Sequence, residues 1–301
     1  MKLNSMRDFM AVAERGSLRA AARQLSIAQP VITRSIQQLE KELGVMLFER
    51  RTKGVCLTPM GEAFLRRSKA VHSELRRAQD ELDQMRGEIH GQIRVCLSGV
   101  PHMALLPNAM GPFRQRFPDV KLDIIDGLLP SVESDLKDGT IDCYVGPVAE
   151  EMASELVIER LFDSTCVVVA RRGHPLINAT SLRELVGAEW AVTSITHAAE
   201  DELWPVFERY GLPMPKLVVQ GHSALTFLFS VAYSNLLMAL PIEWTQTPLF
   251  NQALQRIHVA ETWPPLPICI VRRNGMPLTP AAEYFCDMMR RAAPHMDTLM
   301  N

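Results

Sequence analysis

Two short amphipathic segments joined by a tight break, SLRAAARQLSIAQPVITRSIQQLEKEL, occupy the chain from Ser17 to Leu43. Ser17 is positioned to cap a first helix whose apolar residues share one face. Pro30 suits the first turn of a second helix, because its missing N–H would have no partner there. The expected buried face of the second helix is Ile32, Ile36, Leu39 and Leu43. The segment predicts a helix-turn-helix, with an ordinary αα-hairpin as the alternative.

The face of the second helix opposite Ile32 is polar and has no carboxylate, so it suits base edges and phosphates. This face consists of Gln29, Pro30, Thr33, Arg34 and Gln37. A short hairpin with its turn near Gly54 is predicted at residues 51–58. Beside a DNA-reading helix it would form a wing that contacts phosphates. The phosphate contacts would be Arg50, Arg51 and Lys53, although a solvated edge is the simpler interpretation of each one alone.

Charge is distributed unevenly along the 301 residues. Residues 1–87 hold 16 Lys and Arg against 10 Asp and Glu, whereas the remainder holds 16 against 24. The net charge of −2 therefore conceals a basic N-terminal region, which is typical of a nucleic-acid-binding segment. The acidic remainder is not suited to binding DNA, so we expect it to have a different function.

A long helix is predicted from Pro59 to about Glu88, because Thr58 can cap it and no later proline interrupts it. Its apolar residues form two series with a seven-residue spacing, which is typical of a coiled-coil seam. The series are Phe64, Val71, Ala78 and Met85, and Leu75, Leu82 and Ile89. We expect a dimerising linker helix, with a helix packed on its own domain as the alternative. Two copies would space two recognition helices for a pseudo-palindromic site.

After Gly91 the hydrophobic period changes, and β-rich runs alternate with helical segments. This alternation predicts mainly parallel sheets in two α/β lobes. The predicted strands are 93–98, 121–126, 141–146, 165–170, 190–194, 216–220, 235–240 and 266–272. The predicted helices are 105–117, 131–137, 181–186, 200–210, 224–234 and one that begins after Pro280. Ligands of such sheets bind beyond the carboxyl ends of the strands.

The loops at these strand ends contain the candidate ligand-binding residues. Their hydroxyl and imidazole groups would donate several hydrogen bonds to an anion. The candidates are Ser98, Gly99, Pro101, His102, Leu128, Gly146, Thr193, Thr196, His197 and His222. For each residue alone, a role as a loop cap or a surface group is the alternative. The histidines lack the spacing of metal ligands, so neither a metal nor another cofactor is expected.

Several other classes of protein fit the sequence less well. No segment approaches the roughly 20 apolar residues of a membrane span, and charges between Arg7 and Arg15 argue against a secretory signal. Six scattered cysteines without a CxxC pair favour a reducing compartment, so a cytoplasmic location is expected. An enzyme could use Ser98 or Cys96 as its nucleophile, but no GxSxG, GxGxxG or P-loop motif accompanies them. A transport binding protein or a DNA-organising protein would each explain only part of the chain.

Residues 3–65 contain a spaced pattern that resembles a known family. The pattern reads A-A-x-x-L, then Q-P-x-I-T-x-x-I-x-x-L-E-x-x-L-G-x-x-L-F-x-R, and later L-T-x-x-G. On this pattern the chain resembles a LysR-type transcriptional regulator, and looser matches continue to the C-terminal portion. Ala28 departs from the pattern, because the family usually has Ser or Thr before Gln-Pro.

The resemblance implies three parts. These are a winged helix-turn-helix at 1–58, a dimerising linker helix at 59–89, and an effector-binding domain like a periplasmic binding protein at 90–301. The domain's first lobe would span 91–161 and 268–301, and its second lobe 162–267. Family members are usually tetramers in which a small molecule between the lobes alters DNA bending and the recruitment of RNA polymerase.

Two runs, Asp126–Pro130 and Asp138–Asp142, look similar to members that respond to aromatic sulfonates or carboxylates. By position in the family pattern, Ser98 would contact the anionic group of the effector. The resemblance therefore implies a non-enzymatic regulator that binds double-stranded DNA and a small organic acid.

Overall fold

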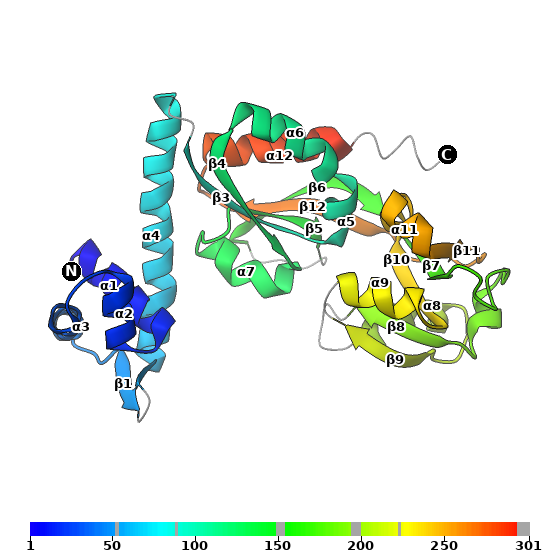
Figure 1. The fold of residues 1–301 in the computed structure, drawn as a ribbon, viewed down its shortest axis with the longest axis horizontal. Coiled ribbons are helices and arrows are strands. Elements are labelled where there is room, and N and C mark those ends of the chain that lie inside the picture. Colours follow the sequence, from blue (N-terminus) through cyan, green and yellow to red (C-terminus); the bar gives the residue numbers. More distant parts are fainter. Residues whose placement is uncertain (52–53, 88–89, 149–153, 194–199, 222–223, 294–301) are drawn as a thin grey trace. The chain divides into compact units, whose positions relative to one another are not determined.

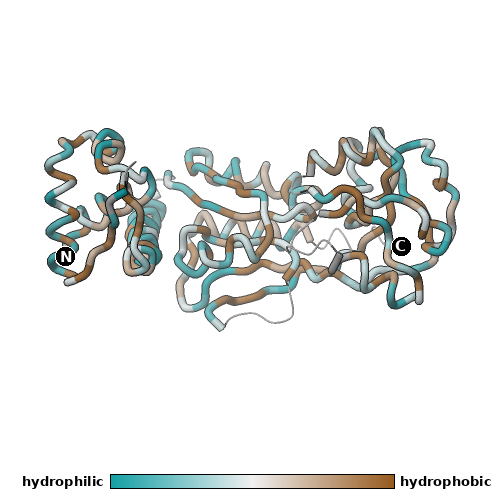
Figure 2. Tube along the Cα trace, turned by 90° about the horizontal axis from the view of Figure 1, so that it is seen from below, coloured by the Kyte–Doolittle hydropathy of each residue, from teal (hydrophilic) through white to brown (hydrophobic). Residues whose placement is uncertain are grey.

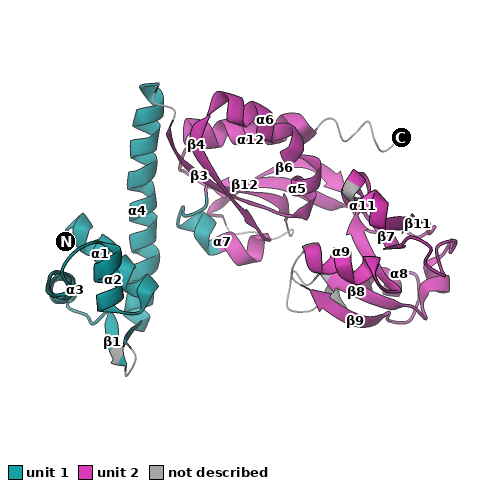
Figure 3. Cartoon of the chain, viewed as in Figure 1, with its two compact units in different colours: residues 1–88, 134–141 teal, residues 89–133, 142–301 magenta. Residues whose placement is uncertain are grey.

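The computed structural model describes residues 1–51, 54–87, 90–148, 154–193, 200–221 and 224–293. The chain divides into two compact units, shown in different colours in Figure 3. One unit comprises residues 1–88 and 134–141, and the other comprises 89–133 and 142–301. Within the described ranges, none of the helices combines the length and the apolar character that crossing a membrane requires.

Three helices and a hairpin build the N-terminal domain (Figure 1). They are α1 (Leu3–Arg15), α2 (Leu18–Gln24), α3 (Gln29–Leu43), β1 (Phe48–Arg51) and β2 (Gly54–Leu57). Ser17 caps α2 as predicted, because its hydroxyl accepts the Ala20 N–H at 3.4 Å. The predicted hairpin is also confirmed, since β1 and β2 pair antiparallel.

The core of this domain contains Ile32, Ile36 and Leu39 of α3, as the helical period predicts. Leu43, expected in the same core, is 37% exposed, because it is the last residue of α3 and the chain turns away at Gly44. Helix α1 was not among the elements predicted from the sequence. Its residues Phe9 and Val12 are fully buried, so α1 supplies much of the core.

Helix α4 (Pro59–Met85) follows the hairpin and has 27 residues, which corresponds to about 40 Å. Thr58 caps it as predicted, because the Thr58 hydroxyl accepts the Gly61 N–H at 3.0 Å. In the hydropathy colouring of Figure 2, α4 is mostly hydrophilic, whereas the strands carry many hydrophobic positions. This helix therefore has the length and the polarity of the expected linker.

The first lobe contains a mixed sheet with the order β4-β3-β5-β12-β6. The strands are β3 (His90–Leu97), β4 (Asp119–Asp126), β5 (Cys143–Pro147), β6 (Leu156–Ser164) and β12 (Leu266–Arg273). The helices are α5 (Gly99–Ala104), α6 (Leu106–Arg116), α7 (Leu129–Lys137) and α12 (Pro280–Ala292). Helices α6 and α12 lie side by side over one face of the sheet, where Phe113 and Phe285 meet edge to face (Figure 1).

The second lobe contains a mixed sheet with the order β11-β7-β10-β8-β9. The strands are β7 (Cys166–Arg171), β8 (Glu189–Thr193), β9 (Lys216–Gly221), β10 (Leu236–Pro241) and β11 (Leu254–Ile257). The helices are α8 (Glu200–Arg209), α9 (Ala224–Ala232), α10 (Ile242–Thr245), α11 (Pro248–Ala253) and the 3-10 turn η1 (Leu182–Leu185). Alternate residues of β7 enter two hydrophobic clusters, so both faces of this sheet are covered.

The prediction of mainly parallel sheets is wrong, because each sheet combines two parallel and two antiparallel pairs. In the first lobe the antiparallel pairs come from the strands through which the chain crosses between lobes. The expected boundary after residue 161 falls inside β6, which stays in the first sheet up to Ser164. The return strand β12 pairs in the same sheet from Leu266.

Candidate functional site

The polar face of α3 is open to solvent. The side chains of Gln29, Pro30, Arg34 and Gln37 are exposed, opposite the buried residues of the same helix. Thr33 is half-buried, and its hydroxyl donates to the carbonyl oxygen of Gln29 at 2.9 Å. Three of these exposed side chains carry hydrogen-bonding or charged groups, so α3 has the surface that reading a DNA groove requires.

The β1–β2 hairpin follows α3 in the sequence and contains the predicted basic residues. Arg51 is exposed at the end of β1, and the backbone of Arg50 pairs with Val55. Lys53 lies outside the described residues. The three-helix core and the β1–β2 hairpin together form a winged helix-turn-helix.

The predicted seam of α4 is exposed from Val71 to Met85. Val71 and Leu75 are 42% and 46% exposed, and Leu82 and Met85 are 52% and 74% exposed. Phe64 instead packs against the core of the N-terminal domain, and Ile89 lies outside the described residues. An exposed apolar stripe on a 27-residue helix is typical of a surface that packs against another helix.

In the first lobe the parallel strands β3, β4 and β5 bring three predicted loops to one edge of the sheet. Ser98 follows β3, Leu128 follows β4, and Gly146 lies near the end of β5. Backbone hydrogen bonds join these loops, because the Ser98 N–H donates to Val145 O at 2.9 Å and the Gly127 N–H to Leu97 O at 3.2 Å. Ser98, Leu128 and Gly146, three of the predicted residues, therefore lie at a common edge of this sheet.

The Ser98 hydroxyl is the most unusual group at this edge. Ser98 is only 3% exposed, and its Oγ has no hydrogen-bond partner among the residues that the structure describes. The Tyr144 ring lies close to it, and the Tyr144 hydroxyl donates to Pro147 O at 3.0 Å. A Cβ on Gly146 would lie 2.3 Å from Tyr144 Oη and 2.7 Å from Ser98 Oγ, so only glycine fits there.

Helix α5 continues from Ser98 and contains three further candidates. Pro101 is buried, and the Nδ1 of His102 lies 2.9 Å from the carbonyl oxygen of Ser98. Gly99 packs against the second lobe, because a Cβ there would lie 2.4 Å from Cζ2 of Trp244 on α10. Helices α5 and α10 therefore form a contact between the lobes beside Ser98.

Glu243, which the sequence did not single out, lies next to Trp244. Its carboxylate accepts a hydrogen bond from the Ser164 hydroxyl at 2.6 Å, at the end of the first crossover strand. The side chain is 1% exposed, and burial raises its pKa. The sequence does contain a signal for Glu243, because it is the one acidic residue in the otherwise apolar run Leu240-Pro-Ile-Glu-Trp.

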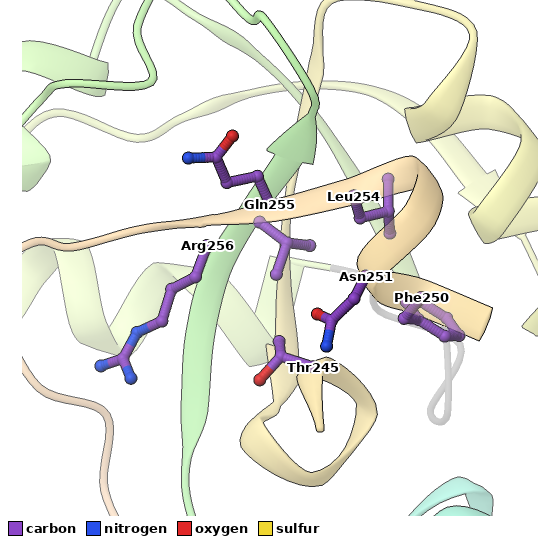
Figure 4. Close-up of a pocket in the computed structure, with 7 residues that line it drawn as sticks. Thr245, Phe250, Asn251, Leu254, Gln255 and Arg256 are labelled. Carbon is purple, nitrogen blue, oxygen red and sulfur yellow. The ribbon is translucent and has the colours of Figure 1, made fainter. Parts of the chain in front are cut away.

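In the second lobe Thr193 also lies at the end of a parallel strand. The backbone of Thr193 pairs with Gly221, so the ends of β8 and β9 lie side by side. Thr196, His197 and His222 lie outside the described residues. A narrow pocket in this lobe is lined by Val169, Thr245, Phe250, Asn251, Leu254, Gln255 and Arg256 (Figure 4). None of the residues predicted to bind an effector lines this pocket.

The thiol considered as a nucleophile is poorly suited to that role. Burial, with a smaller effect of Asp126, raises the pKa of Cys96 to about 12, so the thiolate is scarce at neutral pH. Among the described residues, no group of three His, Cys, Asp or Glu side chains could hold a metal ion.

Comparisons with known proteins agree with this architecture. Residues 3–62 match the bacterial regulatory helix-turn-helix proteins of the lysR family, and residues 86–294 match the LysR substrate binding domain. The chain belongs to the LysR family. LysR-family proteins are DNA-binding transcriptional regulators with an effector-binding domain, and they are not enzymes.

Named relatives cover nearly the whole chain. The HTH-type transcriptional regulator TdcA of Escherichia coli K12 is 25% identical over 283 residues, which cover 94% of this chain and 90% of TdcA. The crystal structure of CbnR, a LysR family transcriptional regulator, is 22% identical, covers 97% of this chain and 99% of CbnR, and has a TM-score of 0.72. Another crystal structure shows full-length CbnR with its target DNA at 23% identity and the same TM-score. The likeness to CbnR shows the fold of this LysR-family chain.

Proposed function

We propose that this LysR-family regulator binds a small organic acid, an aromatic carboxylate or sulfonate, between its two lobes. The supporting observation is the buried Ser98 hydroxyl, which has no hydrogen-bond partner among the described residues. A buried hydroxyl without a partner costs free energy, and an anionic oxygen of a ligand would satisfy it. The flanking strand ends place Leu128 and Gly146 at the same edge.

The remaining effector contacts are proposed from position. Gly99, Pro101 and His102 follow Ser98 on α5, so they would line the same site. From the second lobe, Thr193, Thr196, His197 and His222 would complete it. The aromatic part of the effector would lie among apolar side chains, with Trp244 of α10 as the nearest large ring beside Gly99.

The DNA contacts are proposed on α3 and the wing. Gln29, Pro30, Thr33, Arg34 and Gln37 would face the major groove, where Arg34 is suited to a bidentate contact with guanine. Arg50, Arg51 and Lys53 would contact phosphates and contribute affinity without base preference. We infer that the operator is pseudo-palindromic, because two copies joined through α4 would present two such helices.

The proposed assembly is a homodimer through α4 that pairs further into a tetramer. A second apolar stripe supports the additional interface. On α9 and just beyond it, Leu225, Phe229 and Tyr233 recur at four-residue spacing and are 65%, 57% and 82% exposed. As an activator, the assembly would also recruit RNA polymerase.

Thermal unfolding of the full chain tests the effector proposal. Benzoate and benzenesulfonate are the probes. Acetate, which has the charge but no ring, and benzamide, which has the ring but no charge, are the controls. A ligand at a hundred times its Kd stabilises the folded state by about 2.7 kcal/mol. For a domain of this size that is an increase of about 5–10 °C in Tm.

The matched variants are Ser98→Ala and Ser131→Ala, a serine that follows the neighbouring strand. We expect Ser98→Ala to remove most of the acid-dependent increase and Ser131→Ala to keep it. If neither aromatic acid raises Tm, or if Ser98→Ala responds like the natural chain, the proposed site is wrong.

A further inference from the structure

Helix α4 has a polar face that is buried, although a linker helix is expected to expose its polar residues. Ser73 and Arg77 are each 6% exposed, and both contact residues 139–141, which belong to the same compact unit as α4 (Figure 3). Burying an arginine is unfavourable unless its donors are satisfied. The partners of the Ser73 and Arg77 donors on residues 139–141 therefore explain why this polar face is buried.

Both side chains bind the turn between α7 and β5. Nη2 of Arg77 donates to the carbonyl oxygen of Gly139 at 2.8 Å and to that of Ile141 at 3.4 Å. The Ser73 hydroxyl donates to the same Gly139 oxygen. Nη1 of Arg77 also forms an ion pair with Glu74 at 3.2 Å, which orients the guanidinium. Two donors from successive turns of α4 thus meet on one carbonyl group.

The turn itself is well ordered by its own hydrogen bonds. Gly139 has φ +75°, a conformation that favours glycine. The Thr140 N–H donates to the Asp138 carboxylate at 2.9 Å, and the Ile141 N–H donates to Asp135 O at 3.0 Å. The second of these hydrogen bonds joins the turn to α7.

The chain on either side of the turn leads to the candidate effector site. Helix α7 starts directly after Gly127 and Leu128, and β5 ends at Gly146 and Pro147. The continuous segment 127–147 therefore has both ends at the effector site and its middle bound to α4. Helix α7 and β5 are regular elements, and such elements transmit a displacement over their length.

From these contacts we infer that Arg77 is a positioning residue that couples helix α4 to the effector site through the turn at 138–141. The inference rests on the proposed function only for the role of the strand ends as the effector site. A displacement of α4 on DNA binding would move the Gly139 and Ile141 carbonyl groups and, through β5, Gly146. By linkage, an effector at Gly146 would bias α4 to the same extent.

Hydrogen exchange of the full chain tests this coupling without an effector. The probe is a DNA duplex that the chain selects from a random pool, and the readout is amide exchange in peptides spanning 127–147, with and without the duplex. The variants are Arg77→Met and Arg77→Lys, with Arg67→Met as the control. Arg67 is an exposed residue of the same helix, so its variant has the same loss of charge.

In the natural chain we expect the duplex to change exchange at 142–147 by about threefold or more. Arg77→Met should abolish this change and raise basal exchange at 139–142 about tenfold, whereas Arg67→Met should retain the response. Arg77→Lys should restore part of it, because an ammonium can reach one of the two carbonyl groups. The inference is overturned if the duplex leaves 142–147 unchanged in the natural chain, or if Arg77→Met responds like Arg67→Met. Neither result bears on whether an aromatic acid raises Tm.

Discussion

The two candidate sites of this chain are built in opposite ways. The candidate DNA-reading face comes from one helix, and most of its side chains project into solvent from a backbone held by Ile32, Ile36 and Leu39. The candidate effector site is assembled from strand ends that are distant in sequence, and its central groups, Ser98 and Tyr144, are buried. Substitutions on α3 should therefore change binding without changing stability, whereas substitutions at the effector site should change both.

The largest effect on DNA binding is expected from substitutions in the exposed seam of α4. Replacing Leu75 and Leu82 together by Asp should prevent dimerisation, because two carboxylates would be buried without partners. Loss of two-site binding should weaken affinity for the selected duplex by roughly a hundredfold. Sedimentation and duplex titration measure the two effects. If the double variant remains an oligomer of natural size, α4 is not the dimer surface.

A single substitution on α3 should act on binding alone. Arg34→Ala is expected to weaken binding to the selected duplex by about 1–3 kcal/mol if Arg34 makes a good base contact. Its affinity for a scrambled duplex and its Tm should stay close to those of the natural chain, because the side chain is exposed. Equal losses on both duplexes would assign Arg34 to phosphate contact instead.

At the effector site the corresponding substitution should act on stability. Gly146→Ala places a methyl group 2.3 Å from Tyr144 Oη, so the ring or the strand has to shift. Overpacking of this kind costs about 1–3 kcal/mol, which thermal unfolding would detect. The neighbouring Gly127→Ala meets its nearest atoms at 3.3 Å and should cost less. Equal costs for the two variants would contradict the close packing of Ser98 and Tyr144.

The smallest effect concerns Glu243 and depends on pH. Its pKa is raised in the folded chain, so stability is highest below the ordinary value of 4.5 and falls as pH rises through the raised pKa. Glu243→Gln keeps an acceptor for the Ser164 hydroxyl and removes the titration. It should gain about 1 kcal/mol relative to the natural chain between pH 5 and pH 8. A constant difference across this range would show that Glu243 is already neutralised by another group.

The contrast also explains what the sequence could predict. The capping roles of Ser17 and Thr58 and the core period of α3 depend on local spacing, and the structure agrees with them. Strand–helix alternation likewise identified the carboxyl-end loops at Ser98, Leu128 and Gly146. Tyr144 and Glu243 were missed, because their importance arises from groups that are distant in sequence: Ser98 beside the Tyr144 hydroxyl, and Ser164 bonded to Glu243. The antiparallel crossover strands were missed for the same reason, since pairing partners are distant in sequence.

The most direct test of the account is a nuclease footprint of the full chain on its selected duplex, recorded with and without benzoate and benzenesulfonate. If one of these acids acts between the lobes, the footprint should change in length or in its pattern of enhanced cleavage at acid concentrations that raise Tm. An identical footprint under those conditions would contradict effector control of DNA binding by this class of acid.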